Sequence, residues 1–174
     1  MDAIKNKFLL LDTNVIINSS KNGEEYGGFY NKLRELEVKP VFDLSIRFEF
    51  LRATRDKKDR ERNEKFLDLL FGNGIQELPH DPKEMFDKAK DMAILYGRHS
   101  KPSIEFGDCL IAAQMCKYWD NLFLATENKD DFPRFLFERI HVHTIDVPKK
   151  DEIHNIGIYQ FKKGEYDRLV GELY

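Results

Sequence analysis

The fold class follows from short apolar runs that alternate with segments of helical periodicity. Phe8–Leu11 is an uninterrupted apolar run bounded by Lys7 and Asp12, and a second run lies at 121–125. Runs of this length suit strands buried on both faces, as in a parallel sheet whose connections are helices. We therefore expect an α/β fold with a central, mostly parallel sheet and helices on both of its faces.

The other elements are assigned from the same periodicities. Further strands are expected at 40–42, 75–78 and 141–145, with 153–161 as a strand or hairpin arm. Helices are expected at 26–37, 45–54, 59–71, 82–96, 104–118 and 165–173. The length of 174 residues fits one domain with a small extension. We place the domain at 1–148 and expect 149–174 to pack on it or to mediate contacts.

Composition and charge exclude several classes of protein. Hydrophobic residues make up 41% of the chain, with 14 Phe and 7 Tyr, which argues for a packed core and against disorder. The net charge of −3 means that a polyanionic partner must meet a local basic patch. The five His do not form a metal-binding spacing with the cysteines, and neither a Gly-rich phosphate loop nor a Ser-centred nucleophile motif is present.

The two cysteines indicate a reducing compartment. Cys109 and Cys116 are seven residues apart in one expected helix, about 10 Å along its axis. That separation is too large for a disulfide unless the helix unfolds. No apolar stretch has the length of a signal peptide or a membrane span, so we expect a cytoplasmic protein without membrane contact.

Four acidic stations lie at joints between the expected elements. Asp12 directly follows the first apolar run, and the station 126–131 follows the run at 121–125. Glu49 lies between buried positions of one expected helix, and Asp108 stands at the start of another. Because parallel strands end at a common edge, these acids are expected to converge there. A buried carboxylate is costly unless it is paired or bound to a cation.

Each station also has a purely structural interpretation. Asp12 can cap a helix or close a turn, and Asp108 can complement the dipole of its helix. Glu49 can pair with Arg47 or Arg52, and the fourth station can be a turn closed by its own Thr and Asn. Taken together, however, four clustered acids need a cation. Oxygen ligands select hard ions, so Mg²⁺ or Mn²⁺ is expected, acting on a phosphate through an activated water, with room for a second ion.

Four strings in this order resemble the motifs of the PIN-domain nucleases, and most closely those of VapC-type toxins. They are Leu-Leu-Leu-Asp-Thr-Asn-Val-Ile-Ile at 9–17, Ser-x-x-x-Glu at 45–49, Asp-x-x-Ile-Ala-Ala at 108–113 and Thr-x-Asn-x-x-Asp-Phe at 126–132. The resemblance implies a three-layer α/β/α sandwich and a metal-dependent endoribonuclease. It also implies RNA as substrate, a protein antitoxin as partner and a homodimer.

The resemblance also assigns roles to individual residues. It implies that Asp12, Glu49 and Asp108 are the metal-binding, catalytic acids, and that Asp131 joins the catalytic set. The residues expected to orient the carboxylates and waters are Thr13, Asn14, Thr126, Asn128 and Asp130. Which of Asn128, Asp130 and Asp131 completes the site is left open.

Candidate RNA contacts come from basic residues near the motifs. Arg52 and Arg55 begin a basic-leaning run after Glu49, and Arg98 and Lys101 lie in a short basic segment before Asp108. They are interpreted as phosphate contacts beside the acids. The alternative is a solvated surface with local ion pairs.

Three other functions are compatible with these motifs. A phosphatase or phosphotransferase often uses a strand-end Asp followed two residues later by a second Asp, but position 14 is Asn. A non-catalytic RNA-binding or assembly module would not require the three core acids. Cleavage of DNA, as by flap-type nucleases, uses the same carboxylate chemistry.

Overall fold

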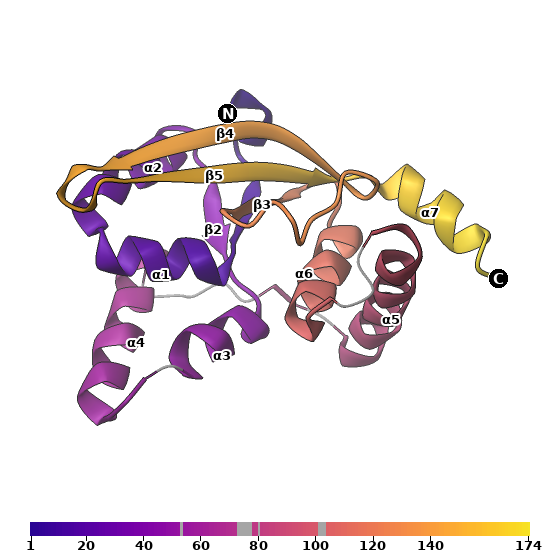
Figure 1. The fold of residues 1–174 in the computed structure, drawn as a ribbon, viewed down its shortest axis with the longest axis horizontal. Coiled ribbons are helices and arrows are strands. Elements are labelled where there is room, and N and C mark those ends of the chain that lie inside the picture. The colour runs from indigo at the N-terminus through magenta and orange to yellow at the C-terminus, as the bar shows by residue number, and fades with distance from the viewer. Residues whose placement is uncertain (53, 73–77, 80, 101–103) are drawn as a thin grey trace.

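The computed structural model describes residues 1–52, 54–72, 78–79, 81–100 and 104–174 (Figure 1). Its strands are β1 (Phe8–Leu11), β2 (Lys39–Val41), β3 (Leu122–Thr126), β4 (Phe137–Val147) and β5 (Glu152–Phe161). Its helices are α1 (Thr13–Lys21), α2 (Gly23–Glu35), α3 (Leu44–Arg52), α4 (Lys57–Phe71), α5 (Pro82–His99), α6 (Phe106–Lys117) and α7 (Lys163–Gly171). Short 3₁₀ turns occupy Asp2–Ile4 and Pro148–Lys150.

The strands form one mixed sheet in the order β2-β1-β3-β5-β4. β2, β1 and β3 are parallel, with Phe8 opposite Leu122 and Leu11 opposite Ala125. β5 runs antiparallel to β3, and β4 runs antiparallel to β5. The C-terminal ends of β1 and β3 therefore lie side by side at one edge of the sheet, as expected from their apolar sequences.

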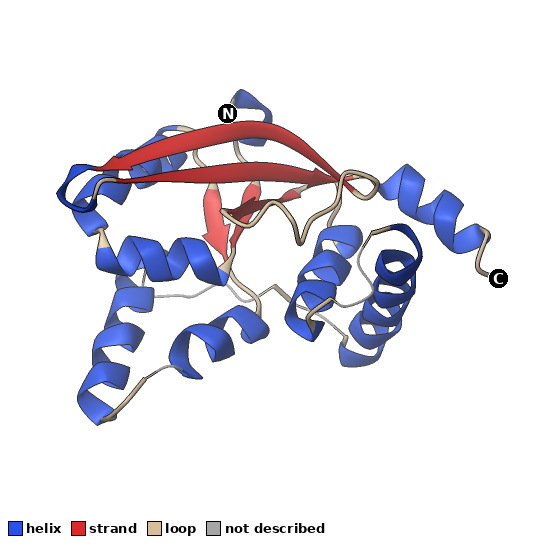
Figure 2. Ribbon diagram, in the orientation of Figure 1, coloured by secondary structure: helices blue, strands red, loops and turns tan. Residues whose placement is uncertain are grey.

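Helices pack on both sides of this sheet, and the expected sandwich architecture is confirmed (Figures 1 and 2). α1 and α6 contact β3, whereas α2 contacts β4. α3 contacts both α1 and α6, and α5 packs on α6. These contacts place the first turns of α1 and α6 around the common edge of β1 and β3.

The core consists of the apolar runs that indicated the fold. Leu9, Leu10 and Leu11 of β1 are fully buried, and all of β3 is buried. β4, by contrast, is an edge strand in which most residues are exposed or half-buried, with a bulge between Arg139 and His141. Among the described residues, no helix combines the length and apolarity needed to cross a bilayer.

Several expected boundaries differ from the structure for physical reasons. Residues 13–21 were not expected as a helix, because Asn, Ser and β-branched residues have low helix propensity. β4 is longer than 141–145, since its pairing with β5 extends it from 137 to 147. The strand expected at 75–78 lies mostly outside the described residues. The segment 152–161, from the expected extension, is β5 and lies between β3 and β4.

Candidate active site

Asp12 stands at the junction of β1 and α1, at the edge where β1 and β3 end. Its backbone N–H donates to the carbonyl of Ala125 at 3.0 Å, which continues the parallel pairing. Its carboxylate caps α1 by accepting from the N–H of Thr13 at 2.6 Å. The structural interpretation of Asp12 as a helix cap is therefore present in the molecule, but it uses only one of the two carboxylate oxygens.

The second oxygen of Asp12 is held by two side chains. Thr126 Oγ1 and Asn14 Nδ2 each donate to Oδ2, both at 2.6 Å. Burial raises the pKa of Asp12, whereas the hydrogen bonds from Thr126, Thr13 and Asn14 lower it and the charge of Glu49 raises it again. Asp12 is thus a buried carboxylate, only 7% exposed, whose orientation is fixed from β1, α1 and β3 together.

Glu49 reaches the same region from α3. Thr13 Oγ1 donates to Glu49 Oε2 at 2.7 Å. Thr13 therefore contacts both carboxylates, because its backbone N–H donates to Asp12. The other oxygen of Glu49, Oε1, lies over Gly107, where a Cβ atom would stand only 2.8 Å from it. Gly107 immediately precedes Asp108 in the first turn of α6. The close approach therefore brings Glu49 to the helix that carries Asp108.

Asp108 has a carboxyl whose pKa is raised by its surroundings. Burial raises its pKa to about 7, and the negative charges of Asp131, Asp12, Glu105 and Glu49 contribute further. Burial and these four acidic neighbours together therefore bring the titration of Asp108 close to neutral pH. We refer to Asp12, Glu49, Asp108 and Asp131 as the acidic centre.

The fourth station is a turn, as its structural interpretation predicted. The N–H of Asn128 donates to Thr126 Oγ1 at 3.0 Å, and the N–H of Asp130 donates to Asn128 Oδ1 at 3.2 Å. Asn128 also donates through Nδ2 to the carboxylate of Asp131. Tyr96 of α5 donates to the carbonyl of Asp131 at 2.8 Å, which fixes this end of the turn.

The two aspartates of this turn, Asp130 and Asp131, lie in different surroundings. Asp131 raises the pKa of Asp108 and so belongs to the acidic centre. Asp130 is exposed and lines a separate cleft with Lys129 and Arg139. Of the three residues left open by the sequence, Asp131 therefore lies beside the other acids and Asn128 lies next to it.

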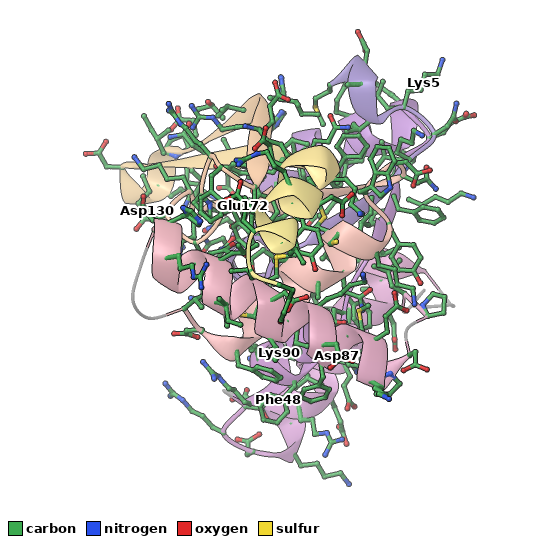
Figure 3. The ribbon with its side chains drawn as sticks, turned by 90° about the vertical axis from the view of Figure 1, so that its right-hand side faces the viewer. Lys5, Phe48, Asp87, Lys90, Asp130 and Glu172 are labelled. Atoms are coloured by element: carbon green, nitrogen blue, oxygen red, sulfur yellow. The ribbon has the colours of Figure 1, made fainter. Side chains whose placement is uncertain are left out.

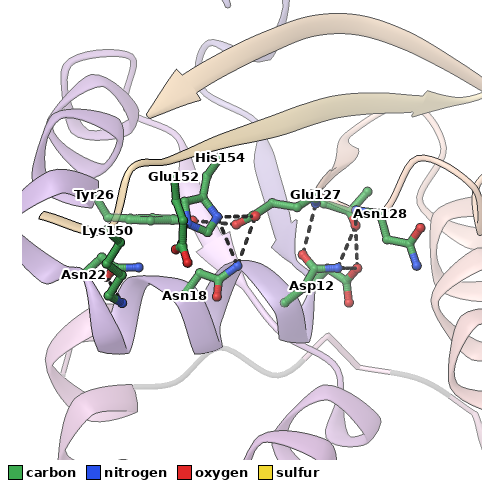
Figure 4. A network of polar contacts seen from close by, with 11 residues as sticks. Asp12, Asn18, Asn22, Tyr26, Glu127, Asn128, Lys150, Glu152 and His154 are labelled. Atoms are coloured by element: carbon green, nitrogen blue, oxygen red, sulfur yellow. Dashed lines mark hydrogen bonds and ion pairs between the residues drawn. The ribbon is translucent and has the colours of Figure 1, made fainter. Parts of the chain in front are cut away.

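Glu127 points away from the acidic centre into a polar network that the sequence did not indicate (Figure 4). Its carboxylate accepts from Tyr26 at 2.5 Å and from Asn18 at 3.0 Å, and lies 2.8 Å from His154 Nδ1. Its backbone N–H donates to Asn14 Oδ1 at 3.0 Å. The network joins α1, α2 and β5 to the end of β3 and fixes the amide that holds Asp12.

A second buried contact joins the two helices that carry Glu49 and Asp108. Asp43 is 5% exposed and accepts from the N–H of Ser45 at 2.7 Å, which caps α3. Its other oxygen accepts from Gln114 Nε2 of α6 at 2.9 Å. This link sets the distance between α3 and α6. Sequence reasoning missed it because neither residue stands in a motif.

The donor chemistry of the acidic centre fits a hard divalent cation. All four side chains offer carboxylate oxygens, which are the ligands that such a cation prefers. Within the described part of the chain, however, no three His, Cys, Asp or Glu side chains are close enough to hold an ion in this arrangement. The four acids lie in one region, but their carboxylates are too far apart in this arrangement to bind one ion together.

The expected RNA-binding residues are scattered. Arg52 lines an apolar cavity of about 390 Å³ that it shares with Glu49 and with Phe48, which is exposed (Figure 3). Arg55 and Arg98 are exposed on the surface. Lys101 lies outside the described residues.

Comparison with known proteins gives one match. A family model described as PIN domain matches residues 9–137, which is most of the chain and includes all four members of the acidic centre. No curated protein and no solved structure matches the chain.

Proposed function

The chain belongs to the PIN domain family, and we propose that it is an endoribonuclease that requires Mg²⁺ or Mn²⁺. Domains of this family are nucleases, which places the protein among hydrolases of phosphodiester bonds. RNA as substrate, the identity of the metal and the roles of single residues are our proposals.

The observation that carries the proposal is the perturbed carboxyl of Asp108. A pKa of about 7 means that burial and the four surrounding acidic charges disfavour a further negative charge in this place. A protein that needed these residues only for folding would gain stability by replacing Asp108 with a neutral side chain. An acid at such a position is expected where a cation offsets the repulsion.

Asp12, Glu49, Asp108 and Asp131 are the residues that would hold the metal. When bound, a divalent ion of this kind activates a water for attack on phosphorus and offsets the charge that develops on the phosphate. For Asp108, ligation requires loss of the carboxyl proton, so metal binding should release a proton near neutral pH.

The neighbouring polar side chains orient these carboxylates. Thr126 and Asn14 fix Oδ2 of Asp12, and Thr13 fixes Oε2 of Glu49. Asn128 donates to Asp131 in the same way. Such outer contacts restrict the oxygens to a narrow range of directions and so reduce the entropy lost on binding.

The environment of Asn14 supports a nuclease over a phosphatase. Its amide donates to Asp12 and to Thr126 at 3.1 Å, and its oxygen accepts from the N–H of Glu127. Both ends of the amide are therefore engaged in positioning. The second acid that a strand-end Asp phosphatase needs at this position is missing.

The proposal is tested with single-stranded RNA, Mn²⁺ and two variants of the acidic centre. Asp12→Asn and Asp108→Asn should each lower the cleavage rate by about 100-fold or more, because each removes a charged ligand. Asp68→Asn, an exposed change on α4, should cleave like the unchanged protein. Equal cleavage by Asp12→Asn, or cleavage that persists in EDTA, would contradict the proposal.

The same preparation separates the alternatives. A chromogenic phosphomonoester should not be hydrolysed, and a single-stranded DNA of the same sequence shows whether the sugar matters. A protein that binds the metal and RNA but cleaves neither nucleic acid would be a binding or assembly module.

The biological role follows the VapC-type resemblance. We extend the proposal to a cytoplasmic toxin that forms a homodimer and is blocked by a small protein antitoxin. A short reading frame directly upstream that encodes a DNA-binding protein would support this role. A toxic effect that is relieved by co-expression of that protein would test it.

A further inference from the structure

A cleft of about 570 Å³ opens beside the fourth station, between the segment 127–136 and the strands β4 and β5. Its basic side chains are Lys129, Arg134, Arg139 and Lys162, and we call the cleft that they line the basic cleft. Asp130 also lines it (labelled in Figure 3), and Ser100 lines it just beyond the end of α5. Lys129 lies within the fourth motif at a position where any residue is allowed, and the other three cations lie outside the motifs.

The charge of the basic cleft is unusual for this chain. Four cations face two acids, Asp130 and Glu138, although the whole protein carries a net charge of −3. Among the residues that the structure describes, none of the four cations belongs to an ion pair, whereas several cations of α2, α4 and α7 do. Lys129, Arg134 and Arg139 are exposed. Exposed cations without acidic partners attract polyanions.

The floor of the basic cleft is held in place by Tyr159 of β5. The ring lies over Gly157, where a Cβ atom would come within 2.5 Å of it, so only glycine leaves room for it. The Tyr159 hydroxyl interacts with Arg139, and the charge of Arg134 also acts on it. Tyr159 therefore lies close to both guanidinium groups, which share the lining of the cleft with it.

The basic cleft is connected to residues that contact the acidic centre. A second cavity of about 300 Å³ shares Lys129, Asp130, Arg139 and Tyr159 with it. This second cavity is also lined by Thr126 and Asn128, the residues that hydrogen-bond Asp12 and Asp131. A strand whose phosphate lies at the acidic centre can thus extend over Thr126 and Asn128 into the basic cleft.

The cavity on the other side of the acidic centre has a different character. Among the described residues it is lined by Glu49, Phe48, Phe86 and Phe106, and Arg52 is the one basic residue of that lining. A polyanion gains less there than in the basic cleft, because one cation rather than four is available. The direction in which a nucleic acid strand leaves the acidic centre is therefore set by charge.

We propose that the basic cleft binds the phosphodiester backbone of single-stranded RNA next to the bond that is cleaved. The proposal rests on the proposed function, because it takes RNA as the substrate. It assigns substrate contacts to Lys129, Arg134, Arg139 and Lys162 in place of the dispersed basic residues near the motifs.

The test measures binding of a labelled 12-nucleotide single-stranded RNA in EDTA, where metal-dependent cleavage is stopped. The double variant Arg134→Gln/Arg139→Gln should bind about 10-fold more weakly or worse. Its slope of log affinity against log salt should fall by about 1.4, because two phosphate contacts are lost. The matched control Lys58→Gln/Lys65→Gln removes two cations of α4 and should change neither value. An equal loss in the control would overturn the proposal.

A gain of binding guards against misfolded variants. Glu138→Gln removes an acid from the basic cleft and should tighten RNA binding by about 2- to 5-fold with a steeper salt slope. Unchanged binding in both this variant and the double Arg variant overturns the proposal. The proposal is also overturned if the double Arg variant binds polyglutamate more weakly than the unchanged protein does but binds RNA with the same affinity.

Cleavage distinguishes this proposal from the proposed function. With Mn²⁺, the double Arg variant should raise KM for the 12-nucleotide RNA and leave kcat unchanged, while Asp108→Asn should abolish kcat and still bind RNA. If no protein cleaves RNA but the binding results hold, the catalytic proposal fails and the basic cleft remains an RNA site. If cleavage requires Asp108 but ignores the Arg residues, the basic cleft is not used.

Discussion

Asp12 combines the two interpretations that its sequence context allows. One oxygen caps α1, and the other is held by Thr126 and Asn14 at the end of β3. A residue that served only as a cap would be replaceable by Ser or Asn at a cost of about 1 kcal/mol or less. The side-chain contacts to Oδ2 restrict replacement further, because they also require a buried acceptor at this position.

Asp108 gives a pH dependence of stability with a definite sign. Its pKa is raised from 3.8 to about 7 by burial and by the charges around it. Between these values the folded state binds a proton that the unfolded state has lost, so stability falls as pH rises from about 4 to 7. The pKa of Asp12 is raised as well and contributes in the same direction.

We therefore expect Asp108→Asn to stabilise the metal-free protein at pH 8 by about 1–2 kcal/mol, a value reduced for partial solvent screening. The variant should also show a weaker loss of stability between pH 5 and pH 8. Urea unfolding in EDTA at both pH values measures this. Asp68→Asn is the control, and a variant less stable than the parent at pH 8 would contradict the account of repulsion.

At the scale of elements, the close packing of α3 against α6 decides where Glu49 and Asp108 lie. Asp43 and Gln114 join the two helices, and Gly107 lets the Glu49 carboxylate lie directly over the first turn of α6. The glycine belongs to a helix, where alanine would ordinarily be more stable by about 0.5–1 kcal/mol. Its presence is explained by the room that Glu49 needs.

Gly107→Ala is accordingly expected to separate stability from activity. The new Cβ would displace Oε1 of Glu49 while favouring the helix, so the protein should fold normally but lose about 10-fold in metal affinity and cleavage. Gly97→Ala in α5 is the matched control, because no atom lies within 4 Å of its Cβ position. Thermal unfolding and metal titration report the two effects. Equal metal affinity in both variants would show that Glu49 is not a ligand.

At the scale of the whole molecule, β5 joins the C-terminal segment to the rest of the sheet. It lies between β3 and β4, and its residues Ile156, Ile158 and Phe161 are buried in the common core. α7 follows it and packs on α5 through Tyr166 and Leu169 (Figure 1). The boundary expected at 148 therefore separates two adjacent strands.

Truncation tests the importance of β5 for folding. The chain 1–148 loses the strand that pairs with both β3 and β4, so we expect no cooperative thermal transition by circular dichroism. The chain 1–162 keeps β5 and should fold, with a lower Tm because the burial of Tyr166 and Leu169 is lost. A cooperative transition of 1–148 close to that of the full chain would show that β5 is dispensable.

Local pattern was sufficient for most of the elements, with α1 as an exception, and for the order of the motifs. The apolar runs of β1 and β3 identified buried strands, and the acids after them marked the edge at which they end. The family resemblance agrees with the match over residues 9–137. These features follow from the sequence because periodicity and strand ends are properties of neighbouring residues.

Only the tertiary structure decided which polar groups meet. α1 forms despite low propensity because Val15 and Ile16 are buried where the helix packs on β3. The placement of Asp131 beside Asp108, of Glu127 in a separate network and of Lys162 in one cleft with the cations of 129–139 depends on packing between segments far apart in the chain. Such contacts are set by the whole core, so no window of sequence contains them.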